Sequence, residues 1–175
     1  MSRFVAPGML FLSCLLLSDA GNATTLNELK VGVRVFDFLK SAPHGPTPLA
    51  VIFDGRNGAS VDDARAIVGW VNSGVSSIKA TFVPSLFDVH QLDAAADYRI
   101  AIVADGTDAS YELIRDYALR NLVLTVSSDL SCMRFGSCTV GIASTPRVEV
   151  VINREVATSC GIEFSEAFRM MVREY

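Results

Sequence analysis

Two unbroken apolar runs of strand length constrain the fold of this chain most strongly, because each is followed by an Asp-Gly pair and a helical segment. The first run covers residues 49–53 and precedes the pair at 54–55; the second covers residues 100–104 and precedes the pair at 105–106. A continuous apolar run predicts a strand that is covered on both faces. Strands that alternate with helices favour right-handed crossover connections and a mostly parallel sheet.

The remaining sequence extends this α/β pattern through helical periodicity and further short apolar runs. The expected helices are 26–39, 61–71, 111–120 and a C-terminal helix with Phe164, Phe168, Met171 and Tyr175 on one face. The expected further strands are 78–83, 122–126, 138–143 and 147–152, whereas residues 86–95 fit either type of element. The last two strands flank Ser144, Thr145 and Pro146 at hairpin distance, which predicts an antiparallel pair.

The fold class follows from this order of elements. We expect a single α/β domain with a three-layer, sandwich-like architecture: a mostly parallel sheet, an antiparallel C-terminal hairpin and flanking helices. Half of the residues are hydrophobic, which is enough to fill one core in a chain of this length. No Gly/Ser-rich linker divides residues 24–175, so this range is expected to form one domain.

The first 23 residues predict a secretory signal peptide. Arg3 precedes an apolar run over residues 9–17, and small residues follow at 21–23, the order of charged, apolar and cleavage regions that such signals have. We expect cleavage after Ala23, with Ala20 as the second choice, and a periplasmic location. A lipid anchor at Cys14 is disfavoured because the apolar run continues past it.

Net charge and cysteine content limit the partners, metals and disulfides that we expect for this chain. The formal net charge is −4, which offers no basic field for nucleic acid. Cys132, Cys138 and Cys160 follow the predicted cleavage site. In an oxidising compartment we expect Cys132 and Cys138 to pair around a short loop, leaving Cys160 as a buried thiol. Their spacing lacks the short pairs of structural zinc sites, so no metal and no cofactor are expected.

The two Asp-Gly turns are candidate ligand loops. Gly55, Gly58 and Ser60 in the first turn and Gly106 in the second could place backbone amides at a small ligand or an anion. Ser60 and Ser110 equally fit helix N-caps. A P-loop or a complete dinucleotide fingerprint is absent from the sequence, so these loops predict a receptor for a small solute as one possible function.

The sequence supports catalysis less than it supports ligand binding. His44 and His90 are the two histidines, and neither lies in a motif that pairs a base with a nucleophile. Asp62 and Asp63 fall in the first turn of a predicted helix, where the helix dipole favours negative charge. We expect no catalytic residues and a protein that is not an enzyme.

Several segments together resemble the YfiR/HmsC family of periplasmic regulators. They are the Phe-rich segment 30–39, the strand end 122–129 with Gly136, and residues 147–153 followed by Gly161, Ile162 and Ser165. The chain departs from the family at Pro43, which lacks a preceding Trp, and in residues 167–171, where the family has a leucine-rich turn.

This resemblance implies a regulator that binds the periplasmic sensory part of an inner-membrane diguanylate cyclase and so restrains cyclic-di-GMP signalling and biofilm formation. It adds weight to the Cys132–Cys138 disulfide and is compatible with a homodimer. A binding surface of this kind depends on a few exposed aromatic or Met side chains. The candidates are Phe38, Phe135 and Met170.

Overall fold

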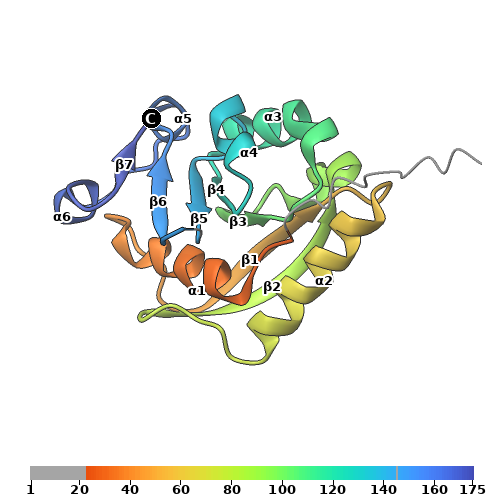
Figure 1. Cartoon of the computed structure of the whole chain (residues 1–175), viewed down its shortest axis with the longest axis horizontal. Helices are drawn as coiled ribbons and strands as arrows, with labels where there is room; N and C mark the ends of the chain where they lie inside the picture. The colour runs from red at the N-terminus through yellow and green to blue at the C-terminus, as the bar shows by residue number, and fades with distance from the viewer. Residues whose placement is uncertain (1–22, 145) are drawn as a thin grey trace, which may run out of the picture.

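A computed structural model describes residues 23–144 and 146–175 (Figure 1). The predicted signal peptide lies outside the described residues except for Ala23, and so does Thr145 of the predicted hairpin. In the described part of the chain, no helix is both long enough and apolar enough to span a membrane.

The described elements alternate strands with helices along most of the chain. The helices are α1 (Leu26–Val35), α2 (Gly58–Asn72), α3 (Tyr111–Asn121), α4 (Leu130–Phe135), α5 (Arg154–Ser159) and α6 (Glu166–Arg169), with 3-10 helices η1 (Phe36–Phe38), η2 (Val89–Ala95) and η3 (Asp108–Ser110). The strands are β1 (Gly45–Phe53), β2 (Ala80–Asp88), β3 (Ile100–Val103), β4 (Leu124–Ser127), β5 (Val140–Ala143), β6 (Glu149–Ile152) and β7 (Arg173–Glu174).

One seven-stranded sheet with the order β2-β1-β3-β4-β5-β6-β7 organises the domain. The first five strands of this order are parallel to their neighbours. β6 then runs antiparallel to β5, with Val140 opposite Ile152, and the short β7 is parallel to β6. The predicted α/β class, its mostly parallel sheet and its antiparallel C-terminal pair are therefore confirmed.

Helices cover both faces of the sheet and complete the three layers. α1 and α2 lie on one side of the sheet, and α3 and α4 lie on the other (Figure 1). The side chains of β1 alternate between two apolar clusters: Leu49 and Val51 pack with α1 and α2, whereas Ala50 and Ile52 pack with α3 and α4. This double burial explains why residues 49–52 in the second half of β1 are apolar without interruption.

Several element boundaries differ from the sequence prediction, those of α2 and β2 among them. α2 begins at Gly58, three residues before the expected start, because Asn57 caps it by accepting from the Ala59 amide. β2 begins at Ala80 and continues to Asp88, so the ambiguous region is part strand and part 3-10 helix. Nine residues of β2 pair with β1, and this partner decided an assignment that local propensity left open.

The predicted long C-terminal helix is wrong. α6 covers only Glu166–Arg169, and Arg173 then pairs with Val151 in the sheet. Phe164 and Phe168 are buried as expected, but Met171 and Tyr175 are exposed. The apolar spacing that suggested a helix arises instead from a short helix packed on the core, followed by an edge strand.

Candidate functional site

The candidate site lies at the carboxyl ends of β1, β2 and β3. In the strand order β2-β1-β3, the connection from β1 leads to β2 on one side, whereas β3 lies on the other. α2 follows β1 on one face of the sheet and α3 follows β3 on the opposite face (Figure 1). Open α/β sheets commonly bind ligands in the crevice at such a switch point.

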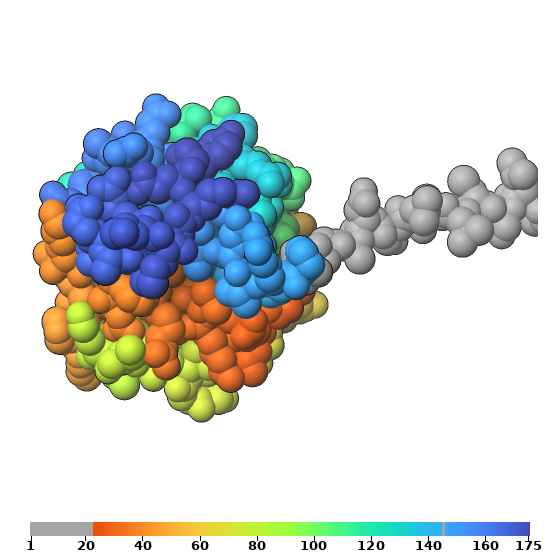
Figure 2. Space-filling view, turned by 60° about the vertical axis from the view of Figure 1, so that its left-hand side comes forward, coloured from red at the N-terminus to blue at the C-terminus, as the bar shows by residue number. Residues whose placement is uncertain are grey.

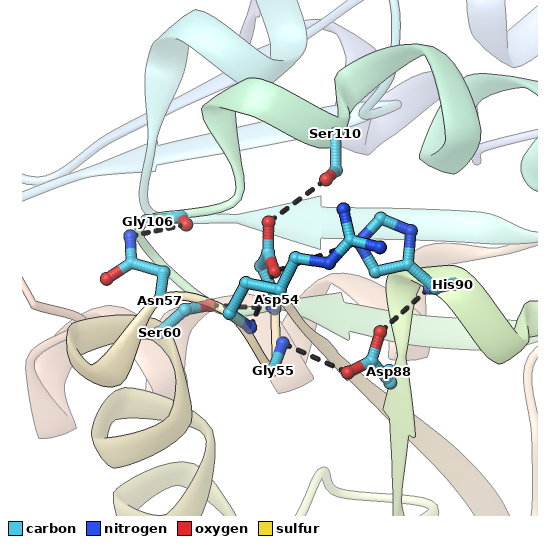
Figure 3. Close-up of polar contacts among 9 residues, drawn as sticks. Asp54, Gly55, Asn57, Ser60, Asp88, His90, Gly106 and Ser110 are labelled. Atoms are coloured by element: carbon cyan, nitrogen blue, oxygen red, sulfur yellow. Dashed lines mark hydrogen bonds and ion pairs between the residues drawn. The ribbon is translucent and has the colours of Figure 1, made fainter.

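Asp54 is the centre of a polar cluster at this edge (Figure 3). Its side chain is buried and accepts from the Arg56 amide at 2.9 Å and from the Ser110 hydroxyl at 3.1 Å. Its own amide donates to the Ser60 hydroxyl at 3.1 Å, and His90 Nε2 lies 3.9 Å from a carboxylate oxygen. The turn after β1, η2 and η3 therefore contribute contacts to the Asp54 carboxylate, and Ser60 of α2 holds the Asp54 backbone amide.

The Asn57 side chain joins the two Asp-Gly turns. The Asn57 side-chain amide donates to the Gly106 carbonyl at 2.9 Å, and a Cβ on Gly106 would lie 2.7 Å from the Asn57 amide nitrogen. Gly106 also has φ +72°, a left-handed conformation that favours glycine. A Cβ on Gly55 would lie 2.1 Å from an Asp88 carboxylate oxygen. Glycine is therefore favoured at Gly106 by its backbone conformation, and a Cβ at Gly55 would force the Asp88 side chain to shift.

Further carboxylates follow β3 and β4. Burial raises the pKa of the Asp105 carboxyl, and the nearby charges of Asp129 and Asp63 raise it further. The Tyr111 hydroxyl donates to Asp129, and burial together with this carboxylate raises the pKa of Tyr111. The carboxyl edge is therefore electrostatically negative, a property that favours ligands with cationic or hydrogen-donating groups.

The structure brings the predicted ligand-loop residues together but gives them different roles. Gly55, Gly58 and Ser60 precede or begin α2, and Gly106 contacts their turn through Asn57. Ser60 is fully buried and is not the N-cap of α2, and Ser110 bonds Asp54 instead of capping α3 with its side chain. The expected N-cap role of Ser60 is wrong, since Asn57 caps α2; Ser110 does occupy the N-cap position of α3, but its hydroxyl bonds Asp54 and makes no capping hydrogen bond.

The amides of the first turn are already used within the protein. Gly55 donates to Asp88, Arg56 to Asp54, and Ala59 to Asn57. An anion at this turn would compete with these acceptors and would meet two carboxylates, which oppose its charge. The geometry therefore favours a neutral or cationic ligand over a phosphate.

Catalytic and metal-binding arrangements are limited at this edge. His90 approaches Asp54, while the hydroxyls of Ser60 and Ser110 bond Asp54 and its amide, so no described serine–histidine hydrogen bond sets up a nucleophile. His44 lies before β1 and outside this cluster. Across residues 23–144 and 146–175, no group of three His, Cys, Asp or Glu side chains is arranged to hold a metal ion.

A separate cavity of about 630 Å³ lies at the opposite, amino edge of the sheet. Its apolar lining includes Leu39, Ile100 and Leu122. Lys40 and Glu163 also line it, but their charged groups already pair with each other at 2.7 Å. The cavity has the volume of a ligand pocket. We favour the carboxyl edge as the ligand site because several elements place different kinds of polar group around Asp54 there.

The predicted partner-binding side chains fall in three separate environments. Phe38 is half-buried and stacks on the buried Phe168, with ring centroids 4.5 Å apart, so it contributes to internal packing. Phe135 is 49% exposed at the end of α4, and Met170 is 87% exposed after α6. Figure 2 shows the C-terminal segment, in blue, lying across the surface next to the orange segment that contains α1.

A disulfide joins Cys132 in α4 to Cys138 just before β5, with the Cα atoms 5.2 Å apart. The bridge spans the end of a helix and its Gly136 cap, whereas the sequence suggested a loop. Cys160 is a free, buried thiol whose pKa is raised by burial. It contacts the Ala118 carbonyl on α3 at 3.5 Å, a contact typical of a packing residue.

The comparisons with known proteins identify a fold and no family. No family model and no curated protein matches the chain, so the resemblance to YfiR/HmsC stays a prediction.

Three similar solved structures set the fold in context. They are an ABC domain in complex with L-Trp from Streptococcus pneumonia (TM-score 0.58, 11% identity, covering 84% of this chain and 61% of that one), a ligand-free, open substrate-binding protein with adhesive properties from Clostridium difficile (0.61, 8%, 87% and 60%), and a conserved domain protein from Vibrio cholerae (0.59, 10%, 83% and 59%). This chain thus spans about three fifths of their length and shares an α/β fold with proteins that bind ligands.

Proposed function

We propose that this chain is an exported small-solute-binding domain that takes its ligand at the carboxyl edge, against the Asp54 cluster and Asp105. The observation that carries the proposal is the convergence of Ser60 from α2, His90 from η2 and Ser110 from η3 on the buried Asp54 at the β1/β3 switch point. The fold shared with an L-Trp-bound domain and with a substrate-binding protein supports it.

The ligand class follows from the charge of this edge. Asp54 and Asp105 follow the neighbouring parallel strands β1 and β3. Asp88 ends β2 and Asp129 follows β4, the strands on either side of that pair. A carboxylate in a partly buried site is stabilised by an opposite charge. We propose a small polar solute with an ammonium group, because such a group would offset the unfavourable burial of Asp105.

A thermal-shift titration of residues 24–175 tests this proposal with amino acids, polyamines, neutral sugars and carboxylates as probes. Compounds with an ammonium group should raise the melting temperature, since ligands that bind only the native state stabilise it by mass action. Asp105→Asn should weaken their binding about tenfold or more by removing the carboxylate, which corresponds to about 1.4 kcal/mol.

Asp97→Asn is the matched control, because Asp97 is exposed and lines the cavity at the amino edge. Its ligand affinity should equal that of the unchanged protein. Binding that survives Asp105→Asn but is lost in Leu122→Arg would place the ligand in the amino-edge cavity and would refute the carboxyl-edge site. A titration in which no probe shifts the melting temperature would count against solute binding altogether.

A second candidate function is regulation of a membrane signalling protein, as the YfiR/HmsC resemblance implies. The exposure of Phe135 favours it, since this ring lies on a helix anchored by a disulfide and has Arg115 5.8 Å above it. Residues 24–175 as bait should recover a diguanylate cyclase from solubilised membranes of the host. Phe135→Ser should abolish that recovery, whereas Phe38→Leu, at a packed position, should preserve it; recovery that is insensitive to Phe135 would contradict this interface.

A further inference from the structure

Thr24, the second residue that the structure describes, lies in an unusual environment. Its backbone nitrogen donates to one carboxylate oxygen of Asp63 at 2.8 Å, and its hydroxyl donates to the other at 2.8 Å. Both residues are buried, Thr24 at 5% and Asp63 at 4% exposure, although the preceding Ala23 is exposed. The Asp63 carboxylate thus binds Thr24, the residue that follows the predicted signal-peptide cleavage site.

Asp63 lacks a cation among the described residues. Its third donor is the Asp105 amide, at 2.8 Å, and no Lys, Arg or His in the described part of the chain forms an ion pair with Asp63, Asp105 or Asp129. Buried carboxylates are normally paired with an opposite charge or fully hydrogen-bonded. Here three neutral donors hold a buried negative charge that has other carboxylates nearby.

We propose that hydrolysis of the Ala23–Thr24 peptide bond completes this site, because the new α-ammonium group of Thr24 then forms a buried ion pair with Asp63. A membrane-bound signal peptidase adds water across the bond. Ala23 leaves with a carboxylate, and the Thr24 nitrogen becomes an amine that takes up a proton at neutral pH. The proposal extends the predicted export of this protein and does not depend on which ligand it binds.

The geometry favours cleavage after Ala23 over cleavage after Ala20. The Thr24 nitrogen already points at an Asp63 oxygen, so the ammonium group forms where its partner lies. Cleavage after Ala20 would leave three further residues and place the ammonium up to roughly 10 Å farther along the chain. The Thr24 hydroxyl also contacts Ser128 at 2.8 Å, which ties the chain start to the loop after β4 as well as to α2.

Processing therefore has a structural consequence at the candidate ligand site. Asp63 joins Thr24 to the Asp105 amide, and Asp105 follows β3 at the switch point. A cation on the Thr24 nitrogen offsets the negative charge around Asp63, and it therefore stabilises the carboxylate that accepts from the Asp105 amide.

Two proteins that differ by one residue test the ion pair. Residues 24–175, released from a fusion so that Thr24 carries the free amine, are compared with residues 23–175, in which the Thr24 nitrogen is an amide. The protein that starts at Thr24 should melt at least about 3 °C higher, a shift expected for a modest gain in stability in a domain of this size. Equal melting temperatures would overturn the proposal.

Asp63→Asn in both proteins shows whether the difference depends on this carboxylate. We expect the variant to remove the gap between the two melting temperatures, even where it lowers both. Asp62→Asn is the matched control, because Asp62 is exposed and pairs with Arg65 on the surface of the same helix. A gap that persists in Asp63→Asn would assign the stabilisation to another cause and refute the pair.

Amine reactivity gives a readout that remains valid if Asp63→Asn fails to fold. At pH 7, an amine-selective aldehyde should label native residues 24–175 at their α-amine at least tenfold more slowly than native residues 23–175, because the first amine is buried and paired. Equal labelling rates would overturn the proposal. Mass spectrometry of the full chain after export should show the loss of residues 1–23; a mature protein that begins at Gly21 would equally refute it.

Discussion

Replacing Phe36 with alanine should lower the free energy of unfolding by about 3–5 kcal/mol, the range measured for large aromatic truncations in cores. The Phe36 side chain is fully buried where α1 ends. Its ring meets that of Phe82 in β2 edge-to-face, with centroids 5.5 Å apart. The truncation removes both the buried apolar surface and this aromatic contact, and it leaves a cavity between α1 and the sheet.

Equilibrium denaturation in urea measures this loss, and Phe135→Ala is the matched control. Phe135 is 49% exposed, so its truncation should cost less than about 1 kcal/mol. The contrast separates a core phenylalanine from one that is free for a partner. Similar losses in both variants would show that Phe135 is packed, and would remove the exposed side chain on which the proposed regulatory interface depends.

Breaking the Cys132–Cys138 disulfide should lower the free energy of unfolding by about 2 kcal/mol. The bridge closes a short loop, with a sequence separation of six, and the entropy that such a loop removes from the unfolded chain sets this magnitude. The variant Cys132→Ser should lose slightly more stability than the reduced protein does. The Cys132 side chain is fully buried, and a serine hydroxyl in its place needs a hydrogen-bond partner.

Thiol titration checks the bridge before stability is compared. Residues 24–175, unfolded without reductant, should show one reactive thiol, that of Cys160, and three after reduction. Cys160→Ala serves as the control, since it should leave no thiol without reductant and two after reduction. Three thiols in the unreduced protein would disprove the disulfide, and the stability difference between oxidised and reduced protein would then vanish.

The strands and helices of the parallel part could be predicted because their signals are local. Residues 49–53 and 100–104 are apolar throughout, and each is followed by an Asp-Gly turn and an amphipathic helix. Strand burial on both faces demands that pattern whatever the detailed contacts are. The antiparallel pair of β5 and β6 was predictable for the same reason, since the turn between them is short.

The C-terminal region could not be predicted in the same way. Phe164 and Phe168 have helical spacing, but they bury their rings by packing on each other and on Phe38, which precedes β1. The last strand exists because Arg173 and Glu174 pair with β6. Pairing of this kind depends on a partner elsewhere in the chain, and a local periodicity does not reveal it.

The candidate site was predictable in position but not in chemistry. The sequence named the two turns, and the parallel sheet places them side by side. It assigned Ser60 and Ser110 to helix caps, because a serine before a helix is most often a cap. Ser110 does lie at the N-cap of α3, but its hydroxyl bonds Asp54, which lies 56 residues away in the chain, and such a contact has no local signal.

The sequence by itself thus determined the α/β class, the parallel order of its repeated units and the location of the two turns, since these depend on apolar patterning and turn residues. Only the tertiary structure decided which side chains meet. The contacts of Asp54 with Ser110 and of Asp63 with Thr24 join segments that are 56 and 39 residues apart. Strand order and helix placement bring those segments together, so the chemistry of the site emerges only when the whole sheet has formed.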